Sequence, residues 1–265
     1  MLISNFWHIL AAVFPSILIL IYIFKQDQFP EPKGIVFKTF VLGASITLAL
    51  DLLIGDVDQY AEKYFVGETL YFFDSFIRAA FLEEFFKMLV IIFYCTRKDE
   101  FDEPMDGLIY GVAASIGFAT YENIQYVLYY LKEPSFEIAW LRAYTAVPMH
   151  ALCGVMMGFL ITQSIFEKKY NYPNLILALL IPVGIHGIYN YSLTSEILSS
   201  QISNVVLFIF LIRAILIFKD LKFKQKRAII FNKKYYIIDG TKFIQAASTV
   251  LLIYLFITFI VSLNY

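Results

Sequence analysis

The chain has 265 residues and a formal net charge of −1; 60% of its residues are hydrophobic and only 16% are charged. Soluble domains are about 45–50% apolar and about 25% charged, so this composition argues against a soluble enzyme and against a disordered chain. The lack of net positive charge argues against nucleic-acid binding. A protein that crosses the membrane several times remains.

Eight apolar stretches, each about as long as a membrane-spanning helix, follow one another along the chain. In chain order they cover 6–24, 35–54, 70–95, 106–131, 140–166, 173–193, 201–218 and 245–263. Polar connections, several of them containing proline, separate the stretches. The sequence therefore predicts an all-α fold, a polytopic membrane helix bundle. It is expected to form a single membrane-embedded domain over 1–265, with a motif-bearing core at about 70–193.

Lysines and arginines are distributed unevenly among the connections. Most of the 21 lie in the first, third, fifth and seventh connections, and the seventh, at 219–242, carries eight of them. Because positively charged connections stay in the cytoplasm, we expect a multi-pass protein of the cell membrane with both termini extracytoplasmic. The basic loop 219–242 is interpreted as a cytoplasmic anchor, and binding of anionic lipid headgroups or of a partner is the alternative.

Three charged residues, Glu83, Glu84 and Lys87, lie near the middle of the third expected span. An ionisable side chain inside a span costs about 2.5–3.5 kcal/mol on insertion scales, which makes it a candidate for function. On a helix, Lys87 lies about 40° from Glu83 and about 60° from Glu84 around the axis, so all three share one face. Two adjacent carboxylates in a low-dielectric site cannot both ionise freely, which suits a general acid or base. The alternative is a structural ion-pair cluster that pins the helix.

The next three spans each carry polar residues. Glu122 and Asn123 lie in the fourth span, His150 lies in the fifth, and His186 and Asn190 lie one turn apart in the sixth. At about 1.5 Å per residue from the expected outer ends, the carboxylate, imidazole and amide groups fall in the outer half of the bilayer or near its midplane. We therefore interpret them, together with the charges of the third span, as one polar site inside the membrane.

Such a site suits two kinds of chemistry. One is hydrolysis, in which a carboxylate or a metal activates water and His or Asn donors stabilise an oxyanion. The other is a proton-coupled transporter or channel that uses the same polar cavity as a relay. A non-catalytic scaffold that binds membrane partners is a third interpretation. The chain has neither a His-Glu-x-x-His nor a Gly-x-Gly-Asp motif, which argues against zincin-like and aspartyl intramembrane proteases.

The residue order resembles the motif series of the PrsW family of intramembrane proteases, which is related to the CAAX prenyl endopeptidases and their bacterial relatives. The resemblance covers about residues 75–195 and rests on Glu83-Glu84-x-x-Lys87, Phe118-x-x-x-Glu122-Asn123, His150 and His186-x-x-x-Asn190. It implies an intramembrane endopeptidase that cleaves membrane-anchored protein substrates, such as an anti-sigma factor at the cell envelope. The implied partners are a single-span or otherwise membrane-anchored protein and the lipid bilayer, with no nucleic acid.

The resemblance also implies roles for individual residues. By position, Glu83 would activate the water with support from Glu84, and His150 would help to bind or activate that water. His186 and Asn190 would stabilise the oxyanion or polarise the substrate.

Two positions depart from the prenyl endopeptidases. Glu122 stands where those enzymes have a histidine, and it is included here among the catalytic candidates. Lys87 replaces the arginine of their motif and would orient the carboxylates, with Asn123 as a second supporting residue.

The sequence leaves the metal question open. The family is often called a metalloprotease, and Zn²⁺ would accept Glu83, His150 and His186 as three ligands with an open fourth position. A metal-free, glutamate-dependent hydrolysis would use the same residues.

Overall fold

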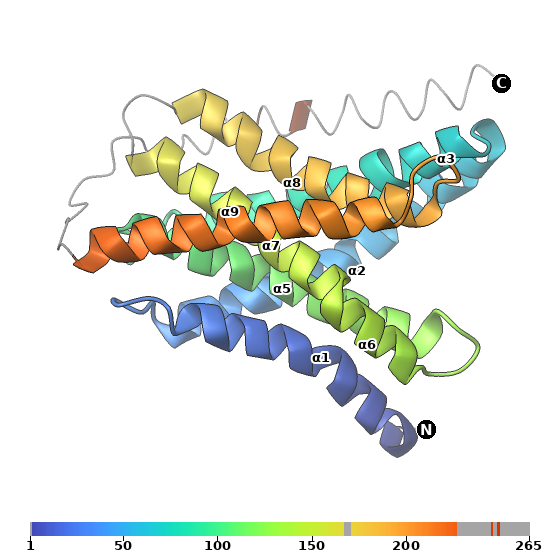
Figure 1. Cartoon of the computed structure of the whole chain (residues 1–265), viewed down its shortest axis with the longest axis horizontal. Coiled ribbons are helices and arrows are strands. Elements are labelled where there is room, and N and C mark those ends of the chain that lie inside the picture. The colour runs from blue at the N-terminus through green and yellow to red at the C-terminus, as the bar shows by residue number, and fades with distance from the viewer. Residues whose placement is uncertain (1, 167–170, 227–244, 246–247, 250–265) are drawn as a thin grey trace.

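The structure is a computed structural model that describes residues 2–166, 171–226, 245 and 248–249 (Figure 1). All secondary-structure elements within these residues are helical, which confirms the expected fold class. Five helical segments of the described part are long and apolar enough to cross a membrane, and these are Asn5–Phe24, Lys33–Asp51, Phe136–Phe166, Tyr172–Thr194 and Gln201–Lys226. The eighth expected span, at 245–263, falls almost wholly outside the described residues.

The described helices follow the expected spans in order. They are α1 (Leu2–Phe24), α2 (Lys33–Tyr64), α3 (Glu68–Phe72), η1 (Phe73–Phe81), α4 (Leu82–Val90), η2 (Ile91–Cys95), α5 (Pro104–Tyr129), α6 (Phe136–Tyr144), α7 (Ala146–Phe166), α8 (Asn171–Thr194) and α9 (Gln201–Lys226).

Two expected spans consist of several helical pieces. In the third, the α-helical turns of α4 lie between the π-helices η1 and η2, a winding that hydrophobic periodicity does not signal and that is frequent at functional sites. The fifth divides at Thr145 into α6 and α7. Pro148 lies in the first turn of α7, where its missing N–H costs no bond within the helix.

Two helices run past their expected ends. α2 continues to Tyr64 instead of ending near 54, and α9 continues to Lys226 instead of ending near 218. Lysine and glutamine are good helix formers, so polar sequence alone does not end a helix. The first part of the expected loop 219–242 is therefore helical, and its remainder lies outside the described residues.

Helix α5 is the centre of the bundle. It packs most extensively against α7 and α2, and α7 in turn packs against α8. Its first half is buried on every side. Small residues make the α5–α7 contact close, because a Cβ atom built on Gly111 would lie 2.3 Å from the carbonyl oxygen of Gly154. This close approach brings polar groups of the two helices within reach of each other.

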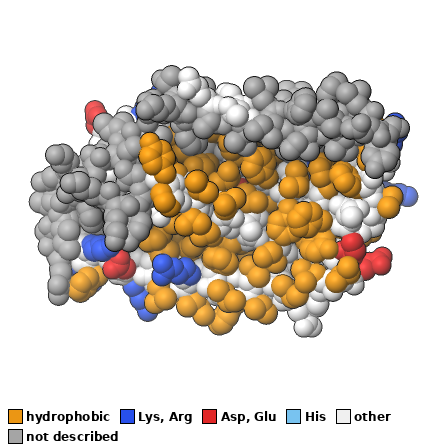
Figure 2. Space-filling model, turned by 90° about the horizontal axis from the view of Figure 1, so that it is seen from above, with side chains coloured by type: hydrophobic (Ala, Val, Ile, Leu, Met, Phe, Trp, Pro, Cys, Tyr) orange, Lys and Arg blue, Asp and Glu red, His pale blue; other side chains and the backbone are white. Residues whose placement is uncertain are grey.

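The described surface is predominantly apolar. Figure 2 shows hydrophobic side chains over most of the described face, with charged groups toward the two ends of the long axis. Large apolar side chains such as Phe14 on α1, Phe37 on α2 and Phe208 on α9 are 55%, 65% and 63% exposed. A surface of this kind is stable against lipid chains and unfavourable in water.

Candidate active site

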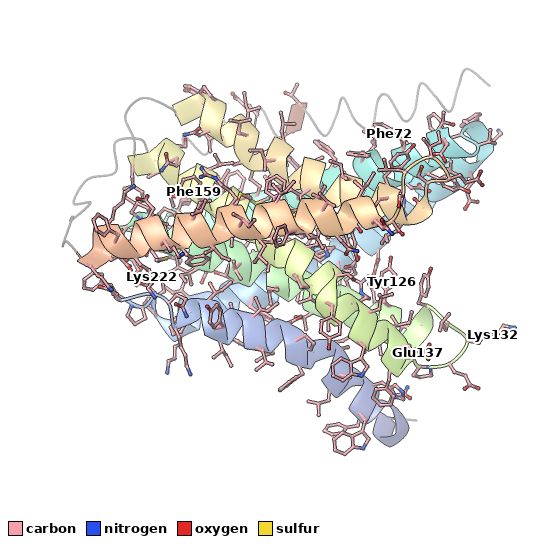
Figure 3. The ribbon with its side chains drawn as sticks, in the orientation of Figure 1. Phe72, Tyr126, Lys132, Glu137, Phe159 and Lys222 are labelled. Carbon is pink, nitrogen blue, oxygen red and sulfur yellow. The ribbon has the colours of Figure 1, made fainter. Side chains whose placement is uncertain are left out.

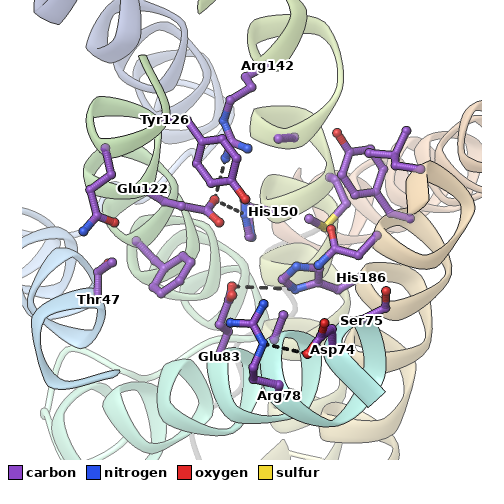
Figure 4. Close-up of a pocket in the computed structure, with 18 of the residues that line it drawn as sticks. Thr47, Asp74, Ser75, Arg78, Glu83, Glu122, Tyr126, Arg142, His150 and His186 are labelled. Atoms are coloured by element: carbon purple, nitrogen blue, oxygen red, sulfur yellow. Dashed lines mark hydrogen bonds and ion pairs between the residues drawn. The ribbon is translucent and has the colours of Figure 1, made fainter. Parts of the chain in front are cut away.

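Four helices contribute the polar groups of the membrane site. Glu83, Glu84 and Lys87 come from α4, Glu122 from α5, His150 from α7 and His186 from α8. Figure 4 shows the side chains of Glu83, Glu122, His150 and His186 directed toward one another. The structure thus brings together both histidines and all three carboxylates that the sequence analysis singled out.

Lys87 connects the inner part of this site. Its side chain is fully buried, and its Nζ lies 2.8 Å from Glu84 Oε1 and 3.6 Å from Glu83 Oε2. The same Nζ lies 3.1 Å from His150 Nδ1 and 4.0 Å from the centre of the Phe118 ring. A buried ammonium group is tolerated only when it is paired in this way.

The contacts of His150 determine its tautomer. A lysine ammonium can only donate, so His150 Nδ1 accepts from Lys87. His150 Nε2 must then carry the hydrogen, and it donates to Glu122 Oε2 at 3.0 Å. Both ring nitrogens are therefore already engaged by protein groups.

His186 faces the glutamate pair. Its Nδ1 lies 3.0 Å from Glu84 Oε1 and 3.8 Å from Glu83 Oε2. The His186 and His150 rings are in edge-to-face contact, with centroids 5.0 Å apart. Glu84 thus lies between Lys87 and His186, and it restrains both.

Arg142 is a member of the site that the sequence analysis did not select. From α6 it reaches Glu122 Oε2 with Nη2 at 2.5 Å, and its guanidinium lies 3.9 Å from the centre of the Tyr126 ring. Its Nε also donates to Asn123 Oδ1, and Asn123 in turn donates to the carbonyl oxygen of Ala12 at 3.0 Å. The available signal was an arginine just inside the start of an expected span, 140–166.

A cavity of about 580 Å³ opens beside these groups. Glu83, Glu122, His150 and His186 line it, and so does Asn190, which makes no side-chain hydrogen bond to the cluster within the described part of the chain. The ion pair of Arg78 with Asp74, at 3.1 Å, lies on the cavity wall (Figure 4).

The two members of the glutamate pair have different surroundings. Glu83 is 8% exposed and lines the cavity, whereas Glu84 is fully buried and is not part of the lining. The Oε2 atoms of both are buried without a hydrogen-bond partner among the described residues. Glu83 is therefore the carboxylate that water in the cavity can reach.

These residues fit a metal ion. Glu83, Glu84, His150 and His186 each place one ligand atom within 4.8 Å of the others. Two carboxylates and imidazole are a donor set that zinc accepts. The partnerless Oε2 atoms of the two glutamates offer free coordination capacity.

The apolar helices and the buried carboxylate–histidine centre define a polytopic membrane protein with a hydrolase-like site. A family model described as PrsW family intramembrane metalloprotease matches residues 31–216. The chain belongs to this family, which confirms the resemblance and the expectation of a membrane protease.

Curated relatives agree with this assignment. Proteins named Protease PrsW from Oceanobacillus iheyensis and Bacillus subtilis are both 36% identical to the chain; the matches cover 69% and 70% of this chain and 81% and 82% of those proteins. A protein of the same name from Geobacillus kaustophilus is 34% identical over 70% of this chain and 79% of its own length. No solved structure matches the chain.

Proposed function

We propose that this protein is an intramembrane endopeptidase that cleaves membrane-anchored protein substrates and uses Glu83 as the base that activates water. The observation that carries the proposal is the difference within the glutamate pair. Glu83 lines the cavity and lies 3.6 Å from Lys87 and 3.8 Å from His186, whereas Glu84 is fully buried and is held by the same two residues at 2.8 and 3.0 Å. A general base must reach the proton that it accepts, and only Glu83 of the pair meets this condition.

The remaining residues position the reacting groups. Glu84 accepts a hydrogen bond from His186 Nδ1, which leaves Nε2 of that ring as the acceptor nitrogen. Glu122 accepts from both His150 and Arg142, so it orients His150 and does not itself activate water. Asn190, on the cavity wall, is the amide that would donate to a polarised carbonyl oxygen.

A bound zinc ion would be held by Glu83, Glu84 and His186, and Glu83 would then serve as a ligand instead of acting as the base. His150 was part of the set expected from the sequence, but its two nitrogens are engaged by Lys87 and Glu122. A zinc ion held there would supply Lewis-acid chemistry, which polarises a carbonyl group and acidifies water.

The substrate class follows from the surroundings of the cavity. The cavity has mixed polar and apolar walls and lies in a bundle with an apolar exterior, which supports a substrate that enters from the bilayer. A single-span protein whose helix is unwound near the cavity would present its peptide bond to Glu83. A cell-membrane location, with the termini outside as the charge distribution predicts, would give access to such envelope proteins.

The test is cleavage of a labelled single-span substrate by the purified full chain in proteoliposomes. Glu83→Gln is expected to lower the rate about 10²–10⁴-fold, the usual contribution of a general base. Asp51→Asn is the matched control, because Asp51 is an exposed carboxylate on the same cavity wall that accepts a hydrogen bond from Gln125 at 2.9 Å. Normal cleavage by a folded Glu83→Gln protein would contradict the proposal.

A further inference from the structure

A second group of acidic side chains lies at the other end of α5. It comprises Asp27 and Glu31 from the α1–α2 connection, and Glu103 and Asp106 at the start of α5. Gln225, near the end of α9, donates through its Nε2 to Asp27 Oδ1 at 2.8 Å and to Glu103 Oε1 at 2.5 Å. We call these five residues the terminal oxygen cluster.

The terminal oxygen cluster is separate from the active site. Asp106 and Glu122 are sixteen residues apart on α5, a separation of about 24 Å at 1.5 Å per residue. Figure 3 labels one neighbour of each site. Lys222 is next to the terminal oxygen cluster, where its Nζ donates to Gln26 Oε1 at 2.9 Å, and Tyr126 is next to the active site. The two labels lie in opposite halves of the molecule.

Several oxygens of this cluster have no partner. Asp106 is fully buried, and Asp27 and Gln225 are 9% and 6% exposed. Asp27 Oδ2, Asp106 Oδ1 and Gln225 Oε1 are all buried without a hydrogen-bond partner among the described residues. Such oxygens cost free energy unless something donates to them or coordinates them.

Helix capping explains only part of the arrangement. Asp106 Oδ2 accepts from the backbone N–H groups of Asp102 and Glu103, at 2.8 and 2.7 Å, as expected for an acidic residue in the first turn of α5. Capping uses only one of the two carboxyl oxygens of Asp106. It gives no reason for Asp27 or Gln225 to be present.

The chain supplies little positive charge to this cluster. None of its four carboxyl groups forms an ion pair with a lysine or arginine in the described residues. Tyr110 donates its hydroxyl to Glu31, and Glu31 faces Asp106 within hydrogen-bonding reach. Protons shared between these carboxyl groups are one way to neutralise them, and a bound cation is the other.

The geometry points to a binding site for a hard divalent cation, of the calcium or magnesium class, at the terminal oxygen cluster. Asp27, Glu103 and Asp106 each place an oxygen within 4.8 Å of the others, a span that fits one coordination sphere with Ca²⁺–oxygen distances of about 2.3–2.6 Å. The donors are all oxygen, which favours these cations over zinc or copper. The side-chain amide of Gln225 now directs its Nε2 to the cluster. Rotation of that amide by half a turn would bring Oε1 there as a further ligand.

A cation bound there would join three parts of the chain. The ligands come from the α1–α2 connection, the start of α5 and the end of α9, which are far apart in sequence. Binding would therefore hold α9 and the α1–α2 connection against the helix that carries Glu122. The expected result is higher thermal stability of the whole bundle.

The test uses the purified full chain in detergent micelles, with ⁴⁵Ca²⁺ in equilibrium dialysis and Mg²⁺ as competitor. Wild-type protein is expected to retain one calcium ion in this site and to melt at a higher temperature with Ca²⁺. Asp27→Asn and Gln225→Leu should each weaken binding at least about tenfold, because the number and charge of the ligands set calcium affinity. Gln225→Lys should place an ammonium group in the cluster, raise the melting temperature without Ca²⁺ and abolish the calcium response.

Two controls separate this site from others. Asp102 has an exposed side chain, and its backbone N–H donates to Asp106 of the cluster. The Asp102→Asn protein should therefore bind Ca²⁺ normally. Glu83→Gln should also bind normally, since it alters the active site only. The proposal is overturned if the wild-type protein retains no calcium ion, or if Asp27→Asn retains as much calcium as the wild type. A melting temperature that responds to pH and not to Ca²⁺ would also overturn it.

Discussion

Around Glu84 and Glu122 the chain supplies its own cations, whereas no described lysine or arginine forms an ion pair with the carboxyl groups around Asp106. Lys87 and Arg142 lie 2.8 and 2.5 Å from the carboxylates of the active site, and two imidazoles fill the space between. The terminal oxygen cluster has an amide in the corresponding place. We expect the internal cations to fix the carboxylates for catalysis, and we expect the carboxyl groups of the terminal oxygen cluster to be compensated by a bound ligand. Substitutions in the active site and in the terminal oxygen cluster test this difference.

The largest effect is expected from removing the internal cation of the active site. Lys87→Met keeps the length and apolar stem of the side chain but leaves Glu84 buried without its ammonium partner. Breaking a buried pair in this way costs about 3–5 kcal/mol, so the melting temperature of the purified protein should fall strongly and cleavage should be lost.

A second substitution tests the cause of that loss. Adding Glu84→Gln to Lys87→Met removes the unpaired charge and should restore much of the stability, though not the activity. Lys132→Met, at an exposed position, is the matched control for loss of a lysine. An unchanged melting temperature in Lys87→Met would show that Glu84 does not depend on this cation.

A smaller effect is expected at Arg142, which acts through Glu122. Arg142→Gln should lower the cleavage rate about 10–100-fold, as loss of a supporting partner does in other polar sites. Arg142→Lys should not restore the rate, because one ammonium group cannot bond both Glu122 and Asn123 in the fork geometry of the guanidinium.

The readout for Arg142 separates positioning from folding. A positioning role predicts a lower kcat with little change in KM, and a smaller fall in melting temperature than Lys87→Met causes, because Glu122 keeps its hydrogen bond from His150. Arg78→Gln is the comparison, since it removes a more exposed ion pair of the same cavity wall. A rate loss no larger than that of Arg78→Gln would contradict the role assigned to Arg142.

The smallest effect is a pH dependence at the terminal oxygen cluster. Burial raises the pKa of Glu103 to about 7, and the nearby charges of Asp27, Asp102 and Glu31 act in the same direction, while Gln225 opposes them. Between pH 4.5 and 7 the folded chain therefore binds more protons than the unfolded chain, so stability falls as the pH rises through this range.

Calorimetry in calcium-free micelles between pH 5 and 8 measures this dependence. The change should stay below about 2 kcal/mol, because Glu103 is only partly buried and solvent screens its charge. Glu103→Gln should flatten the profile. A melting temperature that rises with pH in wild type would contradict the assignment.

Local periodicity allowed much of the site to be predicted. The 83–87 segment places three charges on one helical face whatever the helix contacts, and the contacts of Lys87 with both glutamates confirm this. The small residues before Glu122 allow a close helix approach, as Gly111 against Gly154 shows. Asn123 was expected only to support the site, and the structure shows that it does so by joining Arg142 to α1.

The sequence alone determined that this chain is a membrane helix bundle and which helical faces carry its polar residues. Composition and the 3.6-residue repeat decide both, because each depends only on residues close together in the chain. Only the tertiary structure decided that Glu83 faces the cavity while Glu84 faces Lys87, and that Arg142 reaches Glu122. It also decided that polar groups from three distant segments meet at the start of α5. Such contacts depend on which helices pack together, and packing is a property of the whole bundle.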